Sequence, residues 1–170
     1  MKVDADKIKA AVAWYWRYDR QCPLIAFECS PNGFGGEVSD VLAITEGRHL
    51  VEIEVKLNIA DFRKDRNKGK HRFFKRGSQG ILVAYFYFAV PKEIANKVGL
   101  LCDNLYPYAG VLGVKGYQGF QGDVEVYRRA RLISNQQLSL LQVARIAKGQ
   151  SATLCHLAIK LASNNEQEIR

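Results

Sequence analysis

The chain has 170 residues, of which 48% are hydrophobic and 25% charged, a composition that argues against disorder and supplies the core of one globular domain. Its four cysteines lie far apart without a C-x-x-C pair, and its longest apolar run is too short to cross a bilayer, which argues against structural zinc and a membrane span. The formal net charge is +8. We therefore expect a cytoplasmic protein with free thiols and a single domain over residues 1–170.

Six segments predict strands, because each is rich in apolar or β-branched residues and is bounded by turn residues. They are residues 24–29, 37–44, 49–57, 81–90, 108–114 and 123–133. The second and third flank the tetrapeptide TEGR and therefore predict a β-hairpin. The fourth, ILVAYFYFAV, is apolar throughout, which is typical of a strand in the centre of a sheet with both faces covered.

Four segments predict helices. They are residues 4–19, the residues from Ile59, residues 91–99, and residues 134–165. Asn58 and Ser134 are expected to cap two of them, and Gly69 to limit the second. The last is either one long helix or two helices divided at Gly149. The PNGFGG segment at residues 31–36 predicts a turn. The pattern as a whole predicts an α/β domain in which helices flank a mixed central β-sheet and the last helix is a C-terminal extension.

The third predicted strand, HLVEIEVK, places polar and apolar side chains on opposite faces, so that Glu52, Glu54 and Lys56 share one face. Asp40 lies in the other arm of the hairpin and is expected near Glu54 and Lys56. Two such carboxylates can bind a hard divalent cation, and an ammonium group beside them can orient a water molecule. We expect Asp40, Glu54 and Lys56 to be catalytic, with Asp40 and Glu54 binding Mg²⁺, or Mn²⁺ in its place.

Residues 63–76, the basic segment, hold eight of the 25 Lys and Arg residues and one of the 17 acidic residues. The rest of the chain has 17 basic and 16 acidic residues, a net charge of +1. Charge concentrated in this way favours a surface that binds nucleic-acid phosphates. The residues expected to do so are Arg63, Lys64, Lys68, Lys70, His71, Arg72, Lys75 and Arg76. The interleaved Phe73 and Phe74 are expected in the core rather than stacked on bases.

The order of Asp40 followed by Glu54-Val55-Lys56 resembles the PD-(D/E)XK nuclease superfamily, in which an Asp and an acid-x-Lys pair meet on adjacent strands. The sequence VEIEVKLNIADFRKDR, followed later by YFYFAVPKEI, is similar to the MmcB-like DNA-repair branch of that superfamily, over roughly residues 24–133. The resemblance implies a restriction-endonuclease-like core. It also implies a metal-dependent nuclease that hydrolyses phosphodiester bonds in DNA, in repair or in the processing of branched or damaged DNA. One departure is Ser39, which stands where the motif has proline.

Three further carboxylates compete for the metal site. Glu52 shares the face of Glu54, although a solvated strand residue is the simpler interpretation. Glu37 lies at the mouth of the hairpin arm that carries Asp40, and Glu28 ends the preceding strand. Taken alone, the alternating Glu and Lys residues favour a salt-bridge ladder on a half-exposed strand. Asp40, the basic segment and the resemblance together favour the metal site instead.

Two other functions stay open. The first is a nucleic-acid-binding module on the same fold that has no catalytic activity. The second is a protein-interaction domain whose basic segment meets an acidic partner. DNA is the expected partner, RNA is the alternative, and the sequence also allows a homodimer; no association with a membrane is expected.

Overall fold

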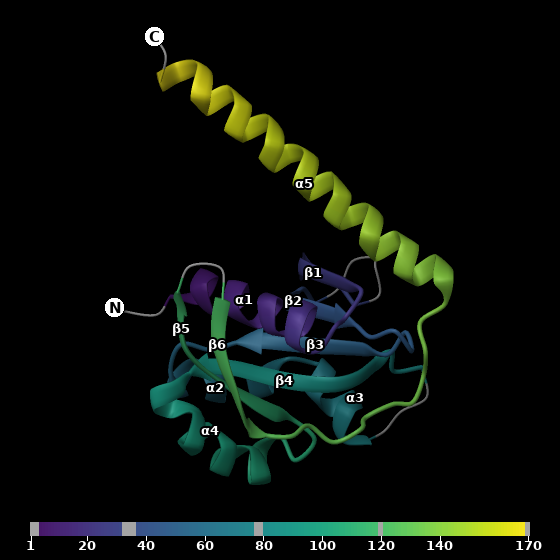
Figure 1. Ribbon diagram of the computed structural model, residues 1–170. Helices are drawn as coiled ribbons and strands as arrows, with labels where there is room; N and C mark the ends of the chain where they lie inside the picture. Colours follow the sequence, from purple (N-terminus) through teal and green to yellow (C-terminus); the bar gives the residue numbers. More distant parts are fainter. Residues whose placement is uncertain (1–3, 32–36, 77–79, 119–120, 169–170) are drawn as a thin grey trace.

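The computed structural model describes residues 4–31, 37–76, 80–118 and 121–168. It contains one six-stranded sheet with helices on both faces (Figure 1). The strands are β1 (Leu24–Cys29), β2 (Ser39–Ile44), β3 (Leu50–Val55), β4 (Val83–Pro91), β5 (Gly110–Gln118) and β6 (Gln121–Arg128). The helical segments are α1 (Ala5–Trp14), η1 (Tyr15–Asp19), α2 (Ile59–Lys64), η2 (Asp65–Asn67), α3 (Lys70–Arg76), α4 (Lys92–Leu105) and α5 (Leu140–Glu168). The predicted α/β architecture with a mixed central sheet is confirmed.

The six strands follow one another across the sheet in the order of the sequence. Strands β1, β2 and β3 are antiparallel neighbours, β3, β4 and β5 run parallel, and β6 is antiparallel to β5. Each parallel pair needs a crossover, which α2, η2 and α3 provide between β3 and β4, and α4 provides between β4 and β5. The chain that leaves β3 therefore carries the basic segment back across the sheet.

Separate hydrophobic layers cover the two faces of the sheet. On one face, Ile8 and Val12 of α1 pack with Val51 and Ile53 of β3. On the other face, α2, α3 and α4 cover an aromatic layer in which Phe62 meets Phe88, with ring centroids 4.9 Å apart. Both faces of β3 are consequently covered, its apolar side chains by α1 and its polar ones by the crossover.

Local sequence signals explain the ends of the first helices. The carboxylate of Asp4 accepts a hydrogen bond from the Lys7 N–H and caps α1, which continues into the π-helical turn η1. As predicted, Asn58 caps α2, because its Oδ1 accepts the Asp61 N–H at 2.9 Å. Gly69 separates η2 from α3. Apart from Pro31, the turn predicted at residues 31–36 lies outside the described residues.

The C-terminal helix begins later than predicted. Ser139, rather than Ser134, provides the cap, since its Oγ accepts the Gln142 N–H at 3.2 Å, and the preceding residues have no regular structure. The helix then continues through Gly149, so the structure has one long helix rather than two. Helix α4 also extends past its predicted end at residue 99, because Cys102 prolongs the buried stripe.

Helix α5 is fastened to the edge of the sheet near its start. The side chain of Gln150 accepts the Phe27 N–H at 2.9 Å and donates to the Phe27 carbonyl at 3.0 Å, so it pairs with β1 as a neighbouring strand would. Beyond this point the helix projects away from the sheet (Figure 1). Within the described ranges, no helix combines the length and apolarity that crossing a membrane requires.

Candidate functional site

The β2–β3 hairpin brings three of the predicted site residues together. Val41 pairs with Ile53 in antiparallel register, so Asp40 lies across from Glu54. The Oδ2 atom of Asp40 accepts the backbone N–H of Val55 at 2.7 Å. Asp40 therefore contacts Val55, the residue between Glu54 and Lys56 in the sequence.

The polar face of β3 is buried rather than half-exposed. Glu52, Glu54 and Lys56 are only 1%, 2% and 7% exposed. The prediction that these three side chains share one face is correct, but the solvated position considered for Glu52 is wrong. The reason is that the crossover after β3 folds back over this face and excludes water from it.

The buried face contains a charged cluster of three carboxylates and three lysines. Its members are Glu52, Glu54, Lys56, Asp65, Lys68 and Lys70. Lys70 Nζ bridges Oε1 of Glu52 and Oε1 of Glu54, at 2.5 Å from each. Lys68 Nζ lies 2.7 Å from Glu54 and 3.1 Å from Asp65. With equal numbers of acidic and basic groups, the cluster is neutral, which makes its burial tolerable.

Asp65 is the residue of this cluster that our sequence interpretation missed. Its Oδ1 lies 2.7 Å from Lys56 Nζ, and its Oδ2 lies 2.6 Å from Nε2 of His71. The other ring nitrogen of His71 is 2.6 Å from the Tyr108 hydroxyl. A signal for Asp65 was present, since it is the only acid in the basic segment.

Burial raises the pKa of Asp40 above its ordinary value, and the nearby Glu54 adds to this, despite the hydrogen bond from Val55. Burial would also raise the pKa of Glu54. There, however, the ammonium groups of Lys70, Lys56 and Lys68 hold the pKa below its ordinary value. The two carboxylates therefore differ: Glu54 stays ionised at neutral pH, whereas Asp40 is the more easily protonated group.

Burial would lower the pKa of Lys56, but Asp65 and Glu54 raise it above its ordinary value. Burial likewise opposes ionisation of Asp65, whereas His71 and Lys56 hold its pKa well below the usual range. Lys56 is consequently a fixed positive charge at neutral pH. It can orient a water molecule or stabilise negative charge, but it cannot accept a proton as a general base.

The two remaining candidate carboxylates lie at the margin of the site. Glu37 is exposed and its Oε1 accepts the Gly69 N–H at 2.9 Å, which ties the start of β2 to the basic segment. Glu28 is exposed and pairs with Lys9. Lys9 lies 3.7 Å from Asp40, so Glu28 reaches the site only through a lysine.

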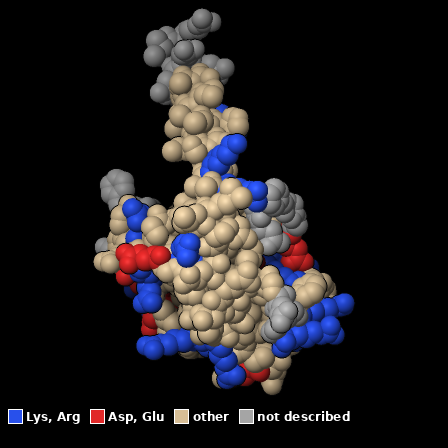
Figure 2. Space-filling model, turned by 90° about the vertical axis from the view of Figure 1, so that its right-hand side faces the viewer, with Lys and Arg blue, Asp and Glu red and all other residues tan. Residues whose placement is uncertain are grey.

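The basic segment divides into buried and exposed cations. Lys70 and His71 point inward, with His71 only 3% exposed, so both depart from the phosphate-binding role expected of them. Lys68 is half-buried against Glu54. The expected cations that remain exposed are Arg63, Lys64, Arg72, Lys75 and Arg76. Figure 2 shows Lys and Arg mainly around the edge of one face of the molecule, whose central area carries neither sign of charge.

The oxygen atoms of Asp40 and Glu54 are the ligands that a hard divalent cation prefers. Asp40 is half-buried and keeps one oxygen free of backbone hydrogen bonds. Both oxygens of Glu54 accept from lysines, so Glu54 can join a cation once Lys68 or Lys70 withdraws. Binding of Mg²⁺ by this pair would therefore require a lysine to leave Glu54. Among the described residues, no group of three or more His, Cys, Asp or Glu side chains forms a metal-binding arrangement.

Comparison with known proteins supports the fold alone. No family model and no curated protein sequence matches the chain. A protein of unknown function from Silicibacter pomeroyi has a similar solved structure, with a TM-score of 0.62 and 19% sequence identity over 93% of this chain and 94% of that chain. The likeness extends over nearly the whole of both chains.

Proposed function

We propose that this protein is a metal-dependent nuclease that hydrolyses phosphodiester bonds in DNA. The observation that carries the proposal is the meeting of Asp40, Glu54 and Lys56 at the ends of β2 and β3, with the Asp40 carboxylate bonded to Val55 N–H at 2.7 Å. The basic segment crosses directly over this point, so a phosphate held by its exposed cations would lie near the carboxylates. The resemblance to the PD-(D/E)XK superfamily supports the same reaction.

Each residue has a distinct role in this proposal. A Mg²⁺ ion held by Asp40 and Glu54 would polarise the scissile phosphate and lower the pKa of a bound water molecule. Lys56 orients the attacking water or offsets the negative charge that develops on the phosphate. Lys68, whose side chain is 33% exposed, leaves Glu54 for the phosphates of the incoming strand, exchanging one anionic partner for another.

A cleavage assay tests the proposal directly. We expect the parent protein with Mg²⁺ or Mn²⁺ to cut at least one substrate from a panel of labelled single-stranded, duplex, flap and branched DNA. Glu54→Gln should cut none of them, because the amide loses the charge that binds the cation. Calorimetric titration with Mn²⁺ should show binding that Asp40→Asn and Glu54→Gln each weaken by roughly tenfold or more.

Two further variants provide a control and a second test for the Mn²⁺ titration. Glu93→Gln removes an exposed carboxylate from α4 and should bind Mn²⁺ as the parent does. Lys70→Met removes the ammonium group that competes for Glu54 Oε1 and should bind Mn²⁺ more tightly. If Asp40→Asn and Glu54→Gln both bind like the parent, the metal site is not at this hairpin.

Binding to duplex DNA should weaken steeply as salt rises, because each phosphate neutralised by a cation contributes about −0.9 to the slope of log affinity against log salt. Replacing the exposed Lys64, Arg72 and Lys75 with alanine should reduce the magnitude of that slope by about 2.7. Fluorescence anisotropy at several salt concentrations measures it.

A matched variant removes the same charge elsewhere. Lys97, Lys115 and Lys148 are exposed residues of α4, β5 and α5, and replacing these three with alanine should leave the slope nearly unchanged. Equal slopes for the two triple variants would assign the phosphate contacts to another surface.

A second candidate function is a DNA-binding module without catalysis. It is favoured by one observation, namely that both oxygens of Glu54 already accept hydrogen bonds from lysines. A protein of this kind would bind DNA with the same dependence on salt but would bind no Mn²⁺ and cut no substrate. The titration and the cleavage panel together separate the two functions.

A further inference from the structure

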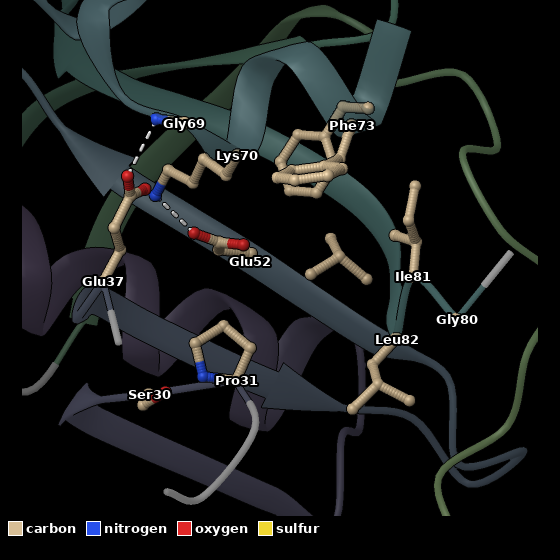
Figure 3. Close-up of a pocket in the computed structure, with 12 residues that line it drawn as sticks. Ser30, Pro31, Glu37, Glu52, Gly69, Lys70, Phe73, Gly80, Ile81 and Leu82 are labelled. Carbon is tan, nitrogen blue, oxygen red and sulfur yellow. Dashed lines mark hydrogen bonds and ion pairs between the residues drawn. The ribbon is translucent and has the colours of Figure 1, made fainter. Parts of the chain in front are cut away.

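A pocket of about 460 Å³ adjoins the charged cluster beneath α3 (Figure 3). This volume lies within the range of small-molecule binding sites. Phe73, Ile81 and Leu82 form apolar walls, with Pro31 opposite them. Three charged residues, Glu37, Glu52 and Lys70, also line it, so the pocket combines apolar walls with the buried Glu52–Lys70 pair and the exposed carboxylate of Glu37.

The aromatic residue in the pocket wall, Phe73 of α3, is exposed to solvent. Phe73 is 57% exposed whereas its neighbour Phe74 is only 8% exposed, so the expectation that both belong to the core holds for Phe74 alone. Phe73 lies on α3 among the exposed cations Arg72, Lys75 and Arg76. A flat aromatic ring next to cations is the combination that stacks an unpaired base while the phosphates on either side are held.

The charged pair in the pocket can recognise the edge of a base. Glu52 is buried, and its Oε1 accepts from Ser39 at 2.8 Å and from Lys70 at 2.5 Å. An ionised carboxylate only accepts hydrogen bonds, and an ammonium group only donates them. Together they complement an amino group beside a ring nitrogen or carbonyl oxygen, which cytosine, adenine and guanine offer. In a duplex the Watson–Crick edges are paired, so only an unpaired base can present that edge to the pocket.

The pocket lies next to the candidate catalytic residues. Lys70 bridges Glu52 and Glu54 at 2.5 Å from each, so a single side chain connects the pocket to the proposed metal ligand. A nucleotide whose base entered the pocket would have its phosphates near Glu54.

We propose that this pocket binds one unpaired DNA base that carries an exocyclic amino group, next to the phosphodiester bond to be cut. The inference rests on the proposed function and narrows its substrate to DNA with an unpaired nucleotide. Phe73 stacks on the base, and Glu52 accepts a hydrogen bond from its amino group.

Fluorescence anisotropy in EDTA tests the pocket without cleavage. The probes are a short labelled duplex with one bulged cytosine, the same duplex with an abasic analogue at the bulge, and the same duplex with a bulged thymine. The parent protein should bind the cytosine bulge roughly 5- to 150-fold more tightly than the abasic one, the range expected for stacking one base on an aromatic ring. Phe73→Ala should remove this preference and remain folded, because the side chain is largely exposed.

Two comparisons make the test specific. Tyr18→Ala removes an equally exposed aromatic side chain, 62% exposed, from the face of the sheet that α1 covers, and it should keep the preference. Glu52→Gln should lessen the preference for cytosine over thymine; because this is a ratio within one variant, a loss of stability does not affect it.

The outcomes separate this inference from the proposed function. If the parent binds the cytosine and abasic bulges equally, or Phe73→Ala keeps the preference, the pocket proposal is overturned while salt-dependent DNA binding can stand. If the parent binds none of the probes, the pocket proposal is also overturned, and the cleavage panel with Mg²⁺ or Mn²⁺ decides the proposed function.

Discussion

Replacing Asp65 with alanine should lower the free energy of unfolding by about 3–5 kcal/mol, the usual cost of removing one partner from a buried ion pair. Asp65 is 3% exposed and lies 2.7 Å from Lys56, 3.1 Å from Lys68 and 2.6 Å from His71. Without it, the cluster keeps three lysines but only two carboxylates, and the excess positive charge is buried. Urea denaturation followed by the fluorescence of the two tryptophans measures the change.

Asp103→Ala is the matched control. The Asp103 carboxylate is 63% exposed and pairs with Arg128 at 3.0 Å, so its loss should cost no more than about 1 kcal/mol. Asp65→Asn keeps the volume of the side chain and should still destabilise more than Asp103→Ala. Equal effects of Asp65→Ala and Asp103→Ala would mean that the buried cluster does not stabilise the fold.

The difference between parent and Asp65→Ala should also depend on pH. His71 and Lys56 overcome the effect of burial and hold the pKa of Asp65 well below its value of 3.8 in a model peptide. A carboxylate with a lowered pKa stabilises the fold above the unfolded pKa and loses this contribution as pH falls toward the folded pKa. The parent should therefore keep its full advantage at neutral pH and lose it progressively below about pH 4.

The hairpin and its polar face could be predicted because strand periodicity acts within a few residues. The alternation in HLVEIEVK places Glu54 and Lys56 on one face whatever the rest of the chain does. The position of Asp40 follows from the pairing of the two arms, which short hairpins enforce. Local signals of the same kind, such as the Asn58 cap, explain the agreement at the start of α2.

The burial of that face could not be predicted, because alternating Glu and Lys residues have the same pattern on exposed and buried strands. What decides between them is the path of the crossover, which brings Lys68, Lys70 and Asp65 over β3. From the sequence alone, a dense run of Lys and Arg residues predicts a surface exposed to solvent. In the structure, Lys70 instead neutralises the buried carboxylates of Glu52 and Glu54, which lie 18 and 16 positions away in the chain.

Replacing Lys56 with methionine should slow DNA cleavage by roughly 100-fold or more, the usual cost of losing one group that stabilises charge in the transition state. This prediction rests on the proposed function. Lys56 Nζ lies 3.2 Å from Glu54 and carries a fixed positive charge, so its effect should be largest when negative charge develops on the phosphate. Affinity for DNA should change little, because ground-state binding rests on the exposed cations of the basic segment.

Single-turnover kinetics, with binding measured separately by anisotropy, distinguish this loss from a general loss of folded protein. Lys56→Met leaves three carboxylates buried with two lysines, so it should also destabilise the fold, although Glu54 keeps Lys68 and Lys70 as partners and Asp65 keeps Lys68 and His71. Cleavage is therefore measured under conditions in which the variant is folded. Lys56→Arg should restore only part of the rate, because a planar guanidinium group would replace a compact ammonium group. The Lys56 side chain is only 8% exposed, so there is little room for the change in shape. As a control, the Lys115→Met variant, which changes an exposed lysine of β5, should cut DNA at the parental rate. If Lys56→Met also cuts at that rate, Lys56 has no catalytic role, and the charged cluster contributes to stability alone.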